Sequence, residues 1–263
     1  MNRMMSVAGT FYPASCEEIK SYIKKFDKIL NDHDIEIEKK DAKAVIVPHA
    51  GYVYSGFTAN MAYKAVKDDK KRVIVIGPSH KIYLEGMSVS MYDEIQTPCG
   101  NLKVDKEYAK KIFDTYPFAT FIKDAHHEHS TETQFPFIKY YFKDIEVVEI
   151  VYGKIDYKLL SLAVDEILKE KDNLLVVSTD LSHFYPLSKA KELDNICLNA
   201  IIKKDLKLFD KGCEACGLTG VKALIMTAQK SDMKVKFLDY RTSYDMTKDD
   251  QSVVGYSSFL FYR

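Results

Sequence analysis

The chain contains no tryptophan, and only 5 cysteines, 7 prolines and 11 glycines occur among its 263 residues. No apolar run approaches the roughly 18 residues that a membrane-spanning helix needs. The opening residues, MNRMMSVAGTFYPAS, lack the apolar core of a secretion signal. Neither sign of charge is in excess, because Lys plus Arg and Asp plus Glu both number 38. A nucleic-acid-binding protein normally has a basic excess, so we expect no nucleic-acid partner. The lack of a membrane-spanning run likewise leads us to expect no membrane partner.

The few cysteines also indicate where the protein works. An odd number in a long chain argues against a disulfide framework and favours a reducing compartment. Hydrophobic residues make up 46% of the chain, enough for a large core, and this excludes general disorder. No repeat, low-complexity tract or Pro/Gly/Ser-rich linker divides it. We therefore predict a cytoplasmic globular protein with one domain over residues 1–263.

Three apolar segments each end in a side chain that can bind a metal or transfer a proton. They are AVIVPHAGYVYSG (44–56), RVIVIGPSH (72–80) and NLLVVSTDLSH (173–183). Each segment predicts a buried strand, and helical patterns lie between them. His49 and His80 follow the first two strands, whereas Asp180 and His183 follow the third. Ligands of open α/β sheets bind at the carboxyl ends of strands, so we expect these side chains to share one site.

This alternation predicts an α/β fold: a single domain with a central mixed or mostly parallel sheet flanked by helices. The last strand, over residues 252–262, alternates apolar and polar side chains and is expected to be half-exposed.

Each candidate residue also has an ordinary structural explanation. A histidine in a loop after a strand often lies in solvent or only caps a helix, and Asp180 can be a helix N-cap. Two histidines at matching positions, however, favour a pair of metal ligands. A carboxylate three residues before a histidine can also orient its imidazole.

Two further polar groups admit more than one interpretation. The run HHEH at 126–129 is either a hydrated loop or a weak metal binder, and its spacing is not that of the HExxH zinc motif. Cys213 and Cys216 form a CxxC pair without the second pair of a zinc ribbon, which leaves a redox role open. We expect Thr219 to cap a helix just after Cys216. The helix dipole would then lower the pKa of Cys216 and favour a thiolate suited to a metal or to nucleophilic attack.

Several segments together resemble the Memo family, including the members encoded near a radical-SAM protein and called AmmeMemoRadiSam system protein B. The resemblance covers nearly the whole chain in order, through VAGTFYPAS (7–15), VPHAGYVYSG (47–56), IGPSH (76–80), EHSTETQFPF (128–137), STDLSHF (178–184) and ACG (215–217). It implies a fold related to class III extradiol dioxygenases, with a non-haem metal site at the open end of the sheet.

The resemblance also implies roles for individual residues. His49, His80 and Cys216 match the metal-site residues of the family, and His183 matches the acid/base histidine of the dioxygenases. Asp180, His129 and Tyr54 match residues that line the same cleft. The dioxygenases have a carboxylate where this chain has Cys216, so we do not expect cleavage of simple catechols.

Three hypotheses about function remain open. The first is a metal-dependent redox enzyme with Fe(II) or Cu, or with Zn, acting on an unknown small molecule. His183 would then be its general acid/base, positioned by His129 and Asp180. The alternative is a non-catalytic binding or adaptor protein that uses the same cleft for a peptide or small molecule. A homo-oligomer is compatible with both. A third hypothesis, redox signalling through Cys213 and Cys216, predicts loss of function when Cys213 is changed.

Overall fold

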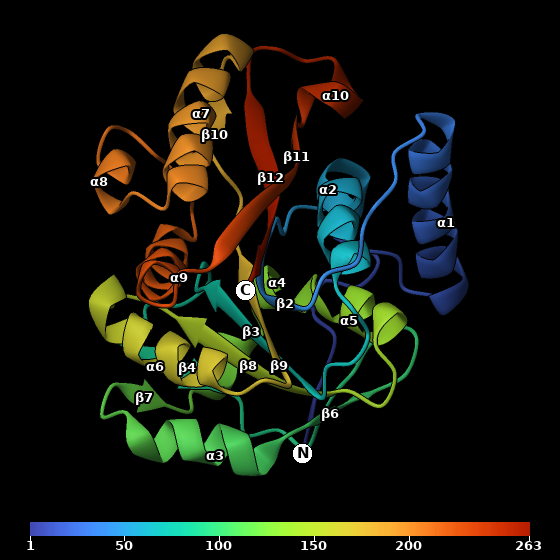
Figure 1. Ribbon diagram of the computed structural model, residues 1–263. Helices are drawn as coiled ribbons and strands as arrows, with labels where there is room; N and C mark the ends of the chain where they lie inside the picture. Colours follow the sequence, from blue (N-terminus) through green and yellow to red (C-terminus); the bar gives the residue numbers. More distant parts are fainter.

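The computed structural model describes residues 1–263 and has a central sheet with helices on both faces (Figure 1). The strands are β1 (Asn2–Arg3), β2 (Ala42–Val47), β3 (Arg72–Pro78), β4 (Met87–Val89), β5 (Glu94–Ile95), β6 (Leu102–Val104), β7 (Ala119–Thr120), β8 (Glu146–Tyr152), β9 (Asn173–Ser178), β10 (His183–Tyr185), β11 (Lys234–Thr242) and β12 (Val253–Tyr262). Their hydrogen-bonded order is β1-β5-β6-β8-β3-β9-β2-β12-β10, with β11 paired to β12 and β4 paired to β7 and β8.

The middle of the sheet is parallel. Strands β6, β8, β3, β9 and β2 run in one direction, whereas β12 is antiparallel to β2, β10 and β11. Parallel strands need crossover connections, and the helices between them supply these. The predicted mixed, mostly parallel sheet is therefore confirmed.

The helices form two layers around the sheet. They are α1 (Cys16–Asp32), α2 (Tyr52–Ala65), α3 (Lys106–Thr115), the 3₁₀ turn η1 (Lys123–His126), α4 (His129–Glu132), α5 (Phe135–Tyr141), α6 (Tyr157–Lys169), α7 (Leu187–Lys203), α8 (Leu206–Phe209), α9 (Leu218–Lys230) and α10 (Tyr244–Thr247). None of them combines the length and hydrophobicity that a membrane span requires.

Alternate side chains of each central strand enter different hydrophobic cores. In β9, Leu175 and Val177 join a core of 34 buried residues that includes the inner faces of α6, α7 and α9. Leu174 and Val176 join a second core of 32 buried residues beneath α1, α2 and α5. Because both faces of these strands are covered, their sequences are almost continuously apolar.

The expectation of a half-exposed last strand was wrong. Strand β12 is buried along most of its length because it lies between β2 on one edge and β10 and β11 on the other. Ser257 and Ser258, neighbours on opposite faces of the strand, are both fully buried. The polar serine residues that led to the expectation of exposure therefore lie in the interior.

The expectation of no disulfides was also wrong. Cys16 is bonded to Cys99 and Cys197 to Cys213, which leaves Cys216 as the free cysteine. The proposed Cys213–Cys216 redox pair is therefore absent. The disulfides also remove the cysteine count as support for a reducing compartment, so the cytoplasmic location stays a prediction.

Candidate metal centre

The candidate residues follow three neighbouring parallel strands at the same relative position. His49 lies two residues after the end of β2, His80 two residues after β3, and Asp180 two residues after β9. Because β9 lies between β3 and β2 in the sheet, the three carboxyl ends are adjacent. The topology thus gathers residues from positions 49 to 180 at one edge, as the sequence predicted.

A glycine brings the fourth segment, which carries Cys216, against this edge. A Cβ atom on Gly217 would lie 2.6 Å from the Cβ of Thr179 and 2.7 Å from the carbonyl oxygen of Ser178. The Gly217 N–H donates to Thr179 Oγ1 at 2.8 Å, which fixes the contact. Only a residue without a side chain allows this approach, and it places Cys216 beside the end of β9.

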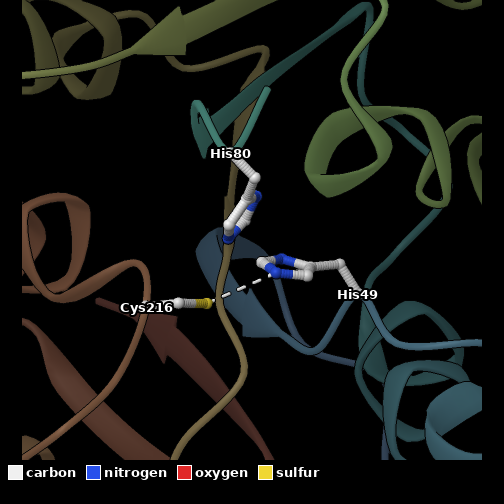
Figure 2. A group of neighbouring side chains, drawn as sticks. All are labelled: His49, His80 and Cys216. Atoms are coloured by element: carbon white, nitrogen blue, oxygen red, sulfur yellow. Dashed lines mark hydrogen bonds between the residues drawn. The ribbon is translucent and has the colours of Figure 1, made fainter. Parts of the chain in front are cut away.

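His49, His80 and Cys216 converge on one point. Each offers one ligand atom, and these atoms all lie within 4.8 Å of one another. The distance between His49 Nε2 and Cys216 Sγ is 3.3 Å, and the two imidazole centroids are 5.3 Å apart. Figure 2 shows the sulfur and one ring nitrogen of each histidine directed toward a common space. His80 is the most exposed of the three and His49 the most buried.

Burial keeps the His49 ring neutral. It lowers the pKa of His49 to about 4, although the nearby Asp180 carboxylate acts in the opposite direction. Asp180 Oδ1 accepts the backbone N–H of His49 at 2.8 Å, and its Oδ2 lies 3.9 Å from His49 Nε2. On the other edge of the ring, Nδ1 lies 3.0 Å from Ser178 Oγ. A neutral imidazole has an unprotonated nitrogen, which metal binding requires.

The Cys216 thiol has the opposite pKa shift from the one expected. Burial, together with the charge of Asp180, raises its pKa to about 12. Helix α9 begins at Leu218 with Gly217 as its N-cap, so the expected capping by Thr219 was wrong. At neutral pH the thiol keeps its proton unless a cation takes the proton's place. Two imidazoles and such a thiol fit a transition-metal ion.

A third histidine ring completes the cluster. The His129 centroid lies 4.7 Å from that of His80 and 5.4 Å from that of His49. Its Nδ1 lies 2.8 Å from Glu128 Oε1, which is also 3.1 Å from Nδ1 of His80. His80, Glu128 and His129 form a second group whose geometry can hold a metal. Burial alone would raise the pKa of Glu128, but hydrogen bonds from His129 and His80 hold it well below its usual range.

The remaining candidates lie outside both groups of ligand atoms. His183 begins β10, is half-buried and packs edge-on against Phe184 at 5.7 Å between ring centroids. Tyr54 is 40% exposed in the first turn of α2 and lines a separate cavity of about 270 Å³ with Tyr22 and Phe26. The structure thus brings together five of the seven candidates: His49, His80, His129, Asp180 and Cys216.

Sequence reasoning treated Glu128 only as part of the HHEH run, and it gave no role to Ser178. Glu128 stands inside a histidine-rich run, which is a signal, but nothing local shows that its carboxylate meets a residue 48 positions earlier. Ser178 is the last residue of a buried strand and gives no signal of its own.

Comparison with known proteins shows what the chain is similar to. The model of the family described as Memo-like protein matches residues 3–260. A MEMO1 family protein of Aquifex aeolicus is 34% identical, with 98% of each chain covered. One of Methanococcoides burtonii is also 34% identical, over 98% of this chain and 99% of its own. The solved structure of an uncharacterized Escherichia coli K12 protein has the same fold at 11% identity. Its TM-score is 0.51, over 81% of this chain and 98% of its own.

Proposed function

This chain belongs to the Memo-like protein family, and on that premise we propose that it is a metal-dependent oxidoreductase acting on a small molecule. One transition-metal ion would be held by His49, His80 and Cys216. The observation that supports the proposal is the convergence of their ligand atoms within 4.8 Å, from positions up to 167 residues apart. A bound ion there would act as a Lewis acid and, if it were iron or copper, would also change oxidation state.

The donor set favours some metals over others. A thiolate is a soft ligand and imidazole suits several transition metals, so the combination favours Cu(I) or Zn(II) and donates more charge to iron than a carboxylate would. Two buried carboxylates, Asp180 and Glu128, stand beside the donors and add negative charge that stabilises a cation. Because the Cys216 pKa is raised, metal binding releases one proton from this residue at neutral pH.

The chain's own groups would perform the remaining tasks. The side chain of His80 is 32% exposed, whereas that of His49 is 2% exposed, so a substrate reaches the centre from the side of His80. His183 would transfer protons as general acid/base, while Asp180 and His129 position the reacting groups.

The proposal is tested by metal titration of the metal-free protein under anaerobic conditions. We expect one equivalent of Zn(II), Cu(I) or Fe(II) per chain by equilibrium dialysis and elemental analysis. His49→Ala and His80→Ala should each remove that equivalent. The absence of stoichiometric binding, or binding that both variants retain, would show that the proposal is wrong. A non-catalytic binding protein would instead hold its ligand equally well with and without the ion.

His183→Ala is expected to separate proton transfer from metal binding. General acid–base catalysis contributes at least about 100-fold, so oxygen uptake by the metal-loaded variant, with ascorbate as reductant, should fall by about that factor. Its metal content should stay at one equivalent, because His183 lies outside both groups of ligand atoms. The exposed His127 supplies the control, since His127→Ala should change neither quantity. Loss of the metal in His183→Ala would show that this histidine is a ligand.

A further inference from the structure

Two histidines of the centre turn the same ring edge toward one buried carboxylate. Glu128 Oε1 lies 2.8 Å from Nδ1 of His129 and 3.1 Å from Nδ1 of His80. The same oxygen accepts the Ser130 N–H at 3.2 Å, and Oε2 accepts the backbone N–H of His80 at 2.6 Å. The Glu128 side chain is 1% exposed, so no bulk water competes for these positions.

This arrangement decides which ring nitrogen carries the proton. An ionised carboxylate only accepts hydrogen bonds, so each Nδ1 that contacts it must be the protonated nitrogen. A neutral imidazole then has its lone pair on Nε2, at the opposite edge of the ring. Figure 2 shows a ring nitrogen of His80 directed toward the space between His49 and Cys216, and this nitrogen is the one away from Glu128.

We propose that Glu128 is the positioning residue of the centre: its shared oxygen keeps the proton of both His80 and His129 on Nδ1, so that both rings present an unprotonated Nε2. The inference rests on the proposed function, in which Nε2 of His80 is a metal ligand, and adds to it. Glu128 itself is not a ligand in this scheme, since three hydrogen bonds from His80 and Ser130 and the close contact with His129 Nδ1 already occupy its two oxygens. One carboxylate thus sets the tautomer of two rings.

Contacts with β1 and with the end of β3 fix the backbone around Glu128. Arg3 in β1 donates from Nη2 to the Glu128 carbonyl oxygen at 3.2 Å. Gly77 lets α4 pack against the end of β3, because a Cβ there would lie 2.6 Å from Ser130 Oγ. Ser130 Oγ in turn donates to the Pro78 carbonyl at 2.7 Å. These contacts hold the carboxylate in place before any metal arrives.

The His49 and His126 rings provide internal comparisons. The Nδ1 of His49 faces the Ser178 hydroxyl, so its tautomer does not depend on Glu128. The fully buried His126 has its Nδ1 2.9 Å from Glu149 Oε2 and lies outside both groups of ligand atoms. Changing Glu128 should therefore affect His80 and His129 together and leave His126 unchanged.

The test measures ring tautomers by two-bond ¹H–¹⁵N correlation spectra of the metal-free, ¹⁵N-histidine-labelled protein. His80→Gln and His129→Gln assign the two signals. In the wild type we expect protonated Nδ1 and unprotonated Nε2 at both positions. Protonated Nε2 at both positions in the wild type would overturn the inference, and this measurement needs no variant at position 128.

Two variants then separate position from charge. Glu128→Gln keeps the shape but turns one acceptor into a donor, and it should alter both tautomers and weaken Zn(II) binding about 10- to 100-fold. Glu128→Asp keeps the charge but withdraws the carboxylate by one methylene, and it should also weaken binding. If Glu128→Asp binds Zn(II) like the wild type, only the charge matters and the inference is wrong. Failure of the wild type to bind Zn(II) would instead contradict the proposed function, whatever the tautomers are.

Discussion

Cys216→Ala is expected to abolish stoichiometric metal binding, with an affinity loss of more than about 100-fold. Loss of a residue that only supports a ligand costs about 10- to 100-fold, and loss of a ligand itself costs more. The remaining pair, His49 and His80, would be two neutral imidazoles without the negative charge that the thiolate supplies. Competition with a chromophoric chelator, using Zn(II) and Cu(I) in parallel, measures the loss. Equal affinity in wild type and variant would remove Cys216 from the centre.

The disulfide three residues away supplies a matched control. The double variant Cys197→Ser, Cys213→Ser removes two sulfurs near Cys216 but no ligand atom. In the wild type the Cys197–Cys213 disulfide joins residues that are 16 positions apart. The chain-entropy model predicts that its removal lowers the free energy of unfolding by about 3 kcal/mol. We expect this loss of stability together with retained metal binding. If the double variant folds but loses the metal, the disulfide belongs to the functional unit.

The same cysteine is expected to determine which metal the proposed centre prefers. Extradiol cleavage uses Fe(II) held by two histidines and a carboxylate, and a thiolate departs from that set. We expect no appreciable cleavage of simple catechols by the wild type with Fe(II) in air, measured by absorbance of the ring-opened product. Cys216→Glu should raise the affinity for Fe(II) relative to Cu(I). Robust catechol cleavage by the wild type would show that this reasoning about ligand softness is wrong.

The sequence predicted the part of the centre that depends on local pattern. His49, His80 and Asp180 each stand two residues after an apolar strand, and parallel order alone brings such ends together. The proximity of these three residues could therefore be predicted from the sequence alone. The position of Cys216 depended on a family resemblance, because the close approach of Gly217 to Thr179 has no local signature.

Long-range partners were the part that sequence could not supply. Cys16 and Cys99 are 83 residues apart, and Arg3 and Glu149 are 146 residues apart. Hydrophobic periodicity predicts which face of an element is buried, but not which distant side chain packs against that face. The expected lowering of the Cys216 pKa was wrong for a related reason. Desolvation depends on the surrounding elements, whereas the sequence shows only the adjacent helix terminus.

Arg3→Met is expected to lower the free energy of unfolding by about 3–5 kcal/mol, because it leaves two buried carboxylates without their cation. Arg3 is fully buried. Its Nε donates to both oxygens of Glu149, at 3.0 and 3.1 Å, and its Nη1 donates to Glu132 Oε2 at 2.7 Å. Methionine fills similar space but offers neither charge nor donor. Urea denaturation at pH 7 measures the difference, and Arg3→Lys, which keeps the charge without the planar fork, should lose less.

The pH dependence of this loss identifies its cause. Burial alone would raise the pKa values of Glu132 and Glu149, but Arg3 and their hydrogen bonds lower both below the usual value. A lowered folded-state pKa gives stability that is present above the ordinary glutamate pKa of about 4.3 and is lost as pH falls through the folded values. In Arg3→Met the buried carboxylates lose their main cation, so protonation relieves them. The stability difference between wild type and Arg3→Met should therefore be largest at neutral pH and shrink in acid. A difference that stays constant from pH 7 to pH 4 would mean that lost packing, rather than unpaired charge, destabilises the variant.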